Sequence, residues 1–96
     1  MAKAYWVACY HSISDPDALA AYAKLAGPAI AAAGGRFLAR GNAAKAYEAG
    51  RTERIVIIEF PTMDDAQAYY HSPEYTAAHK LREGVATAEF IAVTGL

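Results

Sequence analysis

Apolar side chains recur along the chain with two spacings, one typical of strands and one typical of helices. Four segments have the spacing or the composition of strands: 3–13, 34–41, 54–60 and 87–94. The third, Arg-Ile-Val-Ile-Ile-Glu-Phe, is dense in β-branched residues, so we expect it to be buried on both faces. We interpret 42–50 as a continuation of the second strand after a bend at Gly41 and Asn42.

Between the first two strands the apolar residues follow a helical spacing. They are Leu19, Tyr22, Ala23, Ala26 and Ile30. The segment 14–17, Ser-Asp-Pro-Asp, is a helix start, because it combines a capping oxygen, a proline in the first turn and acidic groups near the positive end of the helix dipole. Pro28 removes one backbone hydrogen bond, so we expect it to kink or divide this helix. Gly34 and Gly35 end it.

A second helical stretch precedes the last strand, and a proline interrupts it. Thr62 and Asp65 match the S/T-x-x-D pattern of a helix cap. The apolar stripe that follows comprises Ala66, Tyr69 and Tyr70. The pattern then predicts a new helix, with Ser72 as its cap, Pro73 in its first turn and Gly84 at its end.

This order of elements predicts an α+β fold of the ferredoxin-like type, β-α-β-β-α-β, with residues 1–96 forming one domain. Its antiparallel sheet has four strands, and both helical segments cover the same face. The other face carries Val7, Leu38, Ile55 and Ile57, an apolar surface larger than soluble monomers usually expose. We therefore expect a second copy of the chain to cover it, as a homodimer.

Composition and charge exclude several classes of function. The 96 residues have a formal charge of −1 and scattered basic side chains, which argues against the basic surface that nucleic-acid binding requires. The single cysteine, Cys9, excludes an internal disulfide. The sequence from Met1 onward has no apolar run typical of a signal peptide or a membrane span, so we expect no membrane association and a cytoplasmic protein.

A tight turn at Ala49 and Gly50 would place Glu48 opposite Arg51, and counting outward from it sets Arg40 opposite Glu59. The period of two puts Arg36, Leu38 and Arg40 on one face, shared with Glu59 and with three residues of the first strand. Those three residues are Tyr5, Cys9 and His11. Phe37, Val56, Ile58 and Phe60 then belong under the helices. A bulge at Gly41 would shift this register by one residue.

The polar face has the chemistry of a binding or acid–base site that needs no cofactor. Arg36 and Arg40 can bind a carboxylate through forked hydrogen bonds, while Glu59 or His11 accepts and returns a proton. We expect Tyr5 to line the same cleft. The alternative is that Arg40 and Glu59 form a structural ion pair at the interface between two copies.

Other reactive side chains fit ordinary packing better than chemistry. His71 and His79 are eight residues apart with a helix break between them, so the sequence predicts no metal site. Cys9 is typical of a small strand residue, since its spacing implies no partner base. Tyr69, Tyr70 and Tyr75 fit helix packing, although Tyr75 and Arg82 lie where they could reach the rim of the cleft, and we include Tyr75 among the ligand-binding candidates.

Five blocks of sequence carry a family resemblance: Tyr5-Trp6, Asp15-Pro16, Gly-Gly-Arg-Phe-Leu-Ala-Arg-Gly at 34–41, Glu-Arg-Ile-Val-Ile-Ile-Glu-Phe-Pro at 53–61 and Ser-Pro-Glu-Tyr at 72–75. Together they resemble the domain-of-unknown-function family thirteen-thirty, of the dimeric α/β-barrel superfamily. The resemblance implies a homodimer whose two sheets face each other, with a small-molecule cleft in each protomer. The superfamily includes haem-degrading and quinone-forming monooxygenases and muconolactone isomerase, whereas this family has no established activity.

Residues and resemblance together predict a small-molecule-binding protein or a cofactor-free enzyme whose cleft suits a carboxylate-bearing ligand. One alternative is a non-enzymatic dimerisation or regulatory domain. Another is a monooxygenase of the antibiotic-synthesis or haem-degrading type. The fold alone does not choose among these functions.

Overall fold

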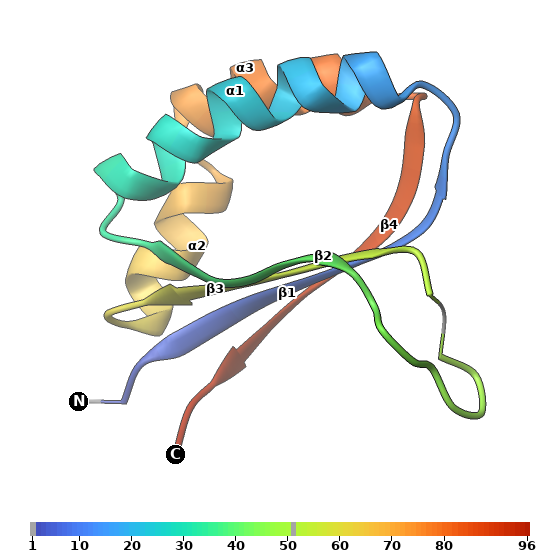
Figure 1. Ribbon diagram of the computed structural model, residues 1–96. Helices are drawn as coiled ribbons and strands as arrows, with labels where there is room; N and C mark the ends of the chain where they lie inside the picture. Colours follow the sequence, from blue (N-terminus) through green and yellow to red (C-terminus); the bar gives the residue numbers. More distant parts are fainter. Residues whose placement is uncertain (1, 51) are drawn as a thin grey trace.

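The computed structural model describes residues 2–50 and 52–96, and its strands and helices lie close to the segments that the sequence predicts (Figure 1). In chain order they are β1 (Ala4–Ile13), α1 (Pro16–Ala32), β2 (Arg36–Asn42), β3 (Arg54–Phe60), α2 (Met63–Tyr70), α3 (Pro73–Arg82) and β4 (Ala86–Thr94). The break before Pro73 is present, so the second helical stretch consists of two helices.

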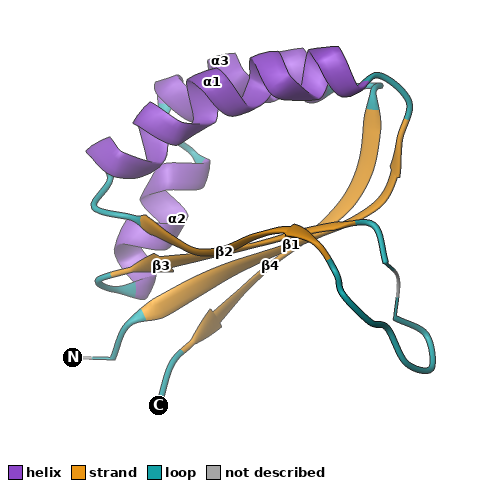
Figure 2. Cartoon of the chain, viewed as in Figure 1, coloured by secondary structure: helices purple, strands orange, loops and turns teal. Residues whose placement is uncertain are grey.

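The four strands form one antiparallel sheet in the order β2-β3-β1-β4. The three helices lie on one face of this sheet, with α1 and α3 side by side (Figures 1 and 2). This arrangement confirms the predicted ferredoxin-like fold. Because all three helices lie on the same side, every strand has one face covered by helices and one face without them.

The core fills the space between the sheet and the helices. Its largest fully buried side chains are Phe60 and Tyr75. The other core residues come from the sheet and from all three helices. They are Ala4, Ala8, Tyr10, Val56 and Ile58 from the strands, Leu19, Tyr22, Ala26, Ala29 and Ile30 from α1, and Ala66, Tyr69 and Ala78 from α2 and α3. Gly35 permits this packing, because a Cβ there would lie 2.7 Å from Cε1 of Phe60 and 2.8 Å from Cγ2 of Ile30.

Side-chain caps fix the beginning of each helix, as the sequence predicts. Asp15 Oδ1 accepts a hydrogen bond from the backbone nitrogen of Ala18 at 3.1 Å. Thr62 Oγ1 accepts from the nitrogen of Asp65 at 3.1 Å, and Ser72 Oγ accepts from the nitrogen of Tyr75 at 3.2 Å. These bonds satisfy donors that have no partner within the first turn of a helix.

Of the two expected effects of Pro28, a kink or a division of the first helix, the division does not occur. Helix α1 continues through Pro28 to Ala32. Proline removes one backbone hydrogen bond, but Ala26, Ala29 and Ile30 on either side of it are buried in the core. Burial of this face outweighs the lost hydrogen bond and keeps the helix in one piece.

The connection between β2 and β3 also differs from the prediction. Residues 43–50 form a loop instead of continuing the strand, with a turn in which Gly50 N donates to Tyr47 O at 2.8 Å. Glu48 has the left-handed φ of 54° in this turn. The predicted pairing of Glu48 with Arg51 lies outside the described residues.

A β-bulge at Leu38 changes the register of β2. Phe37 pairs with Ile58, but the next pair is Ala39 with Ile57, so Leu38 is an extra residue. Side chains before and after a bulge no longer follow one alternation. The predicted pair of Arg40 with Glu59 is wrong, because the loop that joins the strands pairs Arg36 with Glu59. The bulge then pairs Arg40 with Val56, so that Arg40 faces the helices.

The helix-free face of the sheet carries apolar side chains. Val7, Ile55 and Ile57 are half-buried there, and Ile91 and Val93 of β4 are each 51% exposed. In the part of the chain that is described, no helix has the length and apolarity needed to cross a membrane.

Candidate functional site

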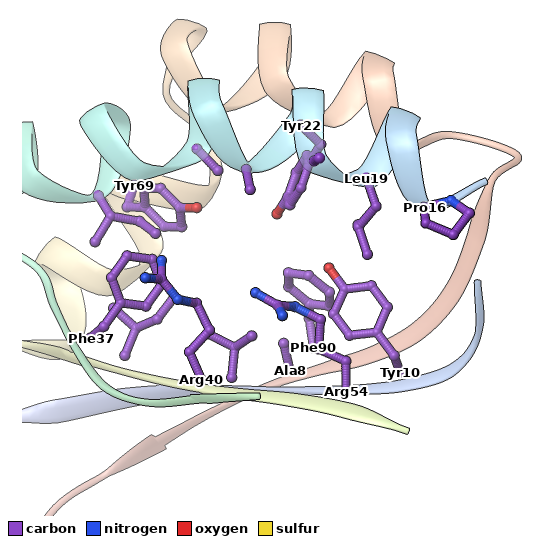
Figure 3. Close-up of a pocket in the computed structure, with 16 residues that line it drawn as sticks. Ala8, Tyr10, Pro16, Leu19, Tyr22, Phe37, Arg40, Arg54, Tyr69 and Phe90 are labelled. Carbon is purple, nitrogen blue, oxygen red and sulfur yellow. The ribbon is translucent and has the colours of Figure 1, made fainter. Parts of the chain in front are cut away.

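A cavity of about 370 Å³ lies between α1 and the helix-covered face of the sheet (Figure 3). Its walls are mainly aromatic and aliphatic. They are formed by Ala8, Tyr10, Pro16, Leu19, Ala20, Tyr22, Ala23, Ala26, Ile30, Phe37, Arg40, Arg54, Val56, Ile58, Tyr69 and Phe90. This volume lies within the range of about 300–1,000 Å³ that is usual for small-molecule sites.

Two arginines give the cavity a positive charge. Arg40 comes from β2 and Arg54 from the first position of β3, and both side chains rise from the sheet toward α1 (Figure 3). The guanidinium carbon of Arg40 lies 4.4 Å from the centroid of the Phe37 ring. Among residues 2–50 and 52–96, neither arginine forms an ion pair with a carboxylate. The cavity therefore presents two guanidinium groups that are free to bind an anion.

Tyrosine hydroxyls supply the other polar groups of the cavity. The hydroxyl of Tyr22 lies 3.0 Å from that of Tyr75, and the two rings meet edge to face. Desolvation by burial, together with the neighbouring Tyr75, raises the pKa of Tyr22 and of Tyr69 far above the ordinary tyrosine value. Burial also raises the pKa of Tyr10, against the opposing charges of Arg82 and Arg54. All three phenols remain protonated hydrogen-bond donors at neutral pH.

Arg82 lies behind the cavity wall. Only 8% of this residue is exposed, and its guanidinium carbon is 4.6 Å from the Phe90 ring centroid and 5.3 Å from that of Tyr22. Burial lowers the pKa of Arg82, but Tyr75, through its charge and a hydrogen bond, raises that pKa more. The prediction that Arg82 could reach the rim is wrong, because stacking on two aromatic rings holds it inside.

The predicted polar face divides into two separate groups of side chains on the helix-free side. In the first, Glu59 Oε1 accepts from Arg36 Nε at 2.9 Å and from Lys3 Nζ at 3.4 Å, with Tyr5 opposite Glu59 in the ladder. Desolvation raises the pKa of Glu59, but the bonds and charges of Arg36 and Lys3 lower it below the usual value. Arg36, Glu59 and Tyr5 thus lie together, apart from Arg40 and the cavity.

His11 belongs to the second group. Its Nε2 lies 2.9 Å from Glu89 Oε1, at an irregularity in the pairing of β1 with β4. His11 lies six positions after Tyr5 along β1, a distance of roughly 20 Å. The structure therefore does not bring His11 and Glu59 into one site. Cys9, on the same face of β1, is a half-buried free thiol.

Tyr75 occupies the core instead of the cleft rim where the sequence placed it. It is 1% exposed and packs against the rings of Tyr69 and Tyr70, with centroid distances of 4.8 and 5.2 Å. The helix-packing interpretation of these tyrosines is thus confirmed. Tyr75 supports the cavity wall from behind, through its hydroxyl contact with Tyr22 and its ring contact with Tyr69.

Sequence reasoning missed most of the residues that line the cavity. Arg54 has the same strand parity as Val56 and Ile58, so the period of two already places it under the helices. Tyr10 likewise has the same strand parity as the buried Ala8, so the period of two places it under the helices as well. Arg40 carries no such signal, because only the bulge at Leu38 turns it toward α1. Within the described ranges, no cluster of three or more His, Cys, Asp or Glu side chains suits a metal ion.

Fold and cavity together define a ferredoxin-like α+β domain with a ligand-sized space between helix and sheet. Residues 3–96 match the model of the family described as "Domain of unknown function (DUF1330)". The chain belongs to this family, as its sequence blocks predict. No curated protein matches the chain.

Several solved structures share the fold. A protein of unknown function from Rhodopseudomonas palustris has a TM-score of 0.75 and 19% identity, over 99% of this chain and 83% of its own. SnoaB, a cofactor-independent oxygenase from Streptomyces nogalater, has a TM-score of 0.65 and 14% identity, over 100% and 95%. A dimeric ferredoxin-like protein of unknown function from Thermobifida fusca has a TM-score of 0.64 and 18% identity, over 98% and 90%. At these identities the likeness concerns the fold.

Proposed function

We propose that the chain is a small-molecule-binding protein whose ligand is an aromatic carboxylate held between α1 and the sheet. The observation that carries this proposal is the pair of cavity-lining arginines, Arg40 and Arg54, which have no carboxylate partner among the described residues. A guanidinium group offers donors that match the two oxygens of a carboxylate.

The walls of the cavity support an aromatic body for this ligand. Phe37, Phe90 and the tyrosine rings offer faces and edges against which a planar ring system can pack. The protonated phenols cannot accept a proton at neutral pH, and the described lining residues include no carboxylate or imidazole. These features favour binding over acid–base catalysis.

A panel of aromatic carboxylates, each paired with its neutral primary amide, tests this proposal. Ligands that bind only the folded protein raise its melting temperature with concentration. We expect naphthoate, or a carboxylate of similar size, to raise the melting temperature, and the matching amide to have little effect. A panel in which no carboxylate stabilises the protein more than its amide would overturn the proposal.

Cofactor-free oxygenation of an acidic aromatic compound is a second candidate, favoured by the similarity to SnoaB. Arg40 and Arg54 would stabilise a phenolate, the electron-rich form that reacts with dioxygen. Since the described lining residues offer no base, the substrate would have to ionise in solution. Oxygen uptake with a panel of hydroquinones, reduced in Arg40→Met, would support this function, and uptake no faster than autoxidation would remove it. Haem added without a spectral change would remove the haem-degrading alternative.

We infer that a second copy covers the helix-free face of the sheet. The apolar side chains of Val7, Ile57 and Ile91 lie on this face, and a similar structure from Thermobifida fusca is described as dimeric. The Arg36–Glu59 pair would then be an interfacial ion pair. Sedimentation at micromolar concentration should give a dimer, and Ile57→Lys a monomer. A wild-type monomer would contradict this inference. A dimer that binds no compound of the carboxylate panel would favour the alternative of a non-enzymatic dimerisation domain.

A further inference from the structure

Three tyrosines from three different elements turn their hydroxyl groups into the cavity. They are Tyr10 of β1, Tyr22 of α1 and Tyr69 of α2, and Figure 3 shows their hydroxyls facing the space between the sheet and α1. Their exposed fractions are 3%, 8% and 3%, so each ring is fixed in the core. The cavity thus has rigid donors in its wall as well as arginines.

Two of these hydroxyls lack a hydrogen-bond partner. The Tyr22 hydroxyl lies 3.0 Å from that of Tyr75, whereas the side-chain hydroxyls of Tyr10 and Tyr69 form no hydrogen bond with any other described residue. Among the described residues, the buried side-chain nitrogen or oxygen atom without a partner is Arg82 Nε, so the hydroxyl oxygens of Tyr10 and Tyr69 are not sealed in the core but lie where the cavity can reach them. Phenylalanine would pack the same rings against the core, so the two hydroxyls are features that packing does not explain.

Arg82 reinforces the donor character of this wall. It contacts the Tyr22 ring from behind, and its guanidinium group can only donate hydrogen bonds. Either hydroxyl of the Tyr22–Tyr75 pair can be the donor, and when Tyr75 donates, the proton of Tyr22 is directed at the cavity. Ligand oxygen atoms facing the three tyrosines can accept hydrogen bonds from these hydroxyls.

We propose that the cavity selects aromatic carboxylates that carry oxygen substituents on the ring, with Tyr10, Tyr22 and Tyr69 donating hydrogen bonds to those oxygens. This inference rests on the proposed function, since it assumes that Arg40 and Arg54 hold the carboxylate at the other end. The arginines then provide affinity for the anion, and the tyrosines determine which aromatic acid is preferred. An unsubstituted aromatic acid binds but leaves the hydroxyls unpaired.

The test compares a dihydroxynaphthoate with its parent naphthoate by titration calorimetry. Each paired hydroxyl is worth roughly two- to tenfold in affinity, so the wild type should prefer the dihydroxy compound by about tenfold or more. Tyr10→Phe and Tyr69→Phe should each reduce the ratio of the affinity for the dihydroxy compound to the affinity for naphthoate. Tyr47→Phe is the matched control, because Tyr47 is 74% exposed and does not line the cavity.

The outcomes separate this inference from the proposed function. Equal binding of both compounds by the wild type, or an unchanged preference in both phenylalanine variants, would overturn the tyrosine inference alone. Binding of neither compound would overturn the proposed function itself. Because phenylalanine removes an unpaired hydroxyl and keeps the ring, the two variants should melt at or above the wild-type temperature. Variants that melt lower would show that the hydroxyls serve the fold instead.

Discussion

Replacing Arg40 and Arg54 together by methionine should reduce affinity for an aromatic carboxylate by about a hundredfold or more. Each guanidinium group offers charge-assisted hydrogen bonds worth about 1.5–3 kcal/mol, and about 1.4 kcal/mol corresponds to a tenfold change. Methionine keeps a long apolar side chain, so the contact of residue 40 with Phe37 is largely preserved. Titration calorimetry of the single and double variants with the strongest carboxylate of the panel measures the effect.

Arg36→Met is the matched control for this experiment. Arg36 lies on the same strand as Arg40 but pairs with Glu59 on the helix-free face. We expect its removal to leave carboxylate affinity unchanged. The opposite pattern, with a loss in Arg36→Met and none in the double variant, would place the ligand on the face that the sequence alone suggests.

Folding stability should fall steeply above pH 10. Burial raises the pKa of Tyr10, Tyr22 and Tyr69 in the folded protein, whereas in the unfolded chain these tyrosines ionise near pH 10. Below pH 10 the three tyrosines are protonated in both the folded and the unfolded state, so their contribution to the free energy of unfolding is fully present. Above it, the unfolded state loses protons that the folded state retains, so each tyrosine lowers the free energy of unfolding by about 1.4 kcal/mol per pH unit.

Urea unfolding of the wild type and of Tyr69→Phe between pH 7 and pH 11 isolates this contribution. Lysines also titrate in this range, but they are the same in both proteins, so the difference in slope reports Tyr69. We expect the variant to lose stability less steeply above pH 10 and Tyr47→Phe to follow the wild type. Parallel curves for the wild type and Tyr69→Phe would show that Tyr69 ionises normally in the folded state.

Local sequence signals predicted the elements well because the relevant interactions are local. The caps at Asp15, Thr62 and Ser72 bond to backbone groups three residues away, so a short pattern contains both partners. The buried alternation of Val56 and Ile58 likewise needs only the strand itself. Pro28 is the exception, since tertiary burial on both sides of it decided whether the helix continues.

The candidate site was harder to predict because it depends on register. Because Leu38 is an extra residue in β2, Arg40 faces the cavity, whereas Arg36 faces the helix-free side together with Glu59. No side-chain pattern in 34–41 distinguishes a bulge at Leu38 from one at Gly41. The assumed tight turn at Gly50 made the count start from the wrong position, since a loop connects the two strands.

The sequence contains the aromatic residues of the cavity, but their helical spacing predicts packing and not a site. Tyr22 and Tyr69 lie on apolar helix stripes, and such residues are usually core residues. They are indeed buried, and their hydroxyls are what distinguishes them. Only the structure shows that hydroxyls from separate elements face one space (Figure 3).

The location of a bound carboxylate tests the central claim most directly, and strand β3 provides an internal comparison. Val56 and Ile58 line the cavity, whereas Ile55 and Ile57 face the helix-free side of the same strand. In a protein with labelled valine and isoleucine methyl groups, we predict intermolecular nuclear Overhauser effects from naphthoate to Val56 and Ile58. Effects to Ile55 and Ile57 instead would contradict the account.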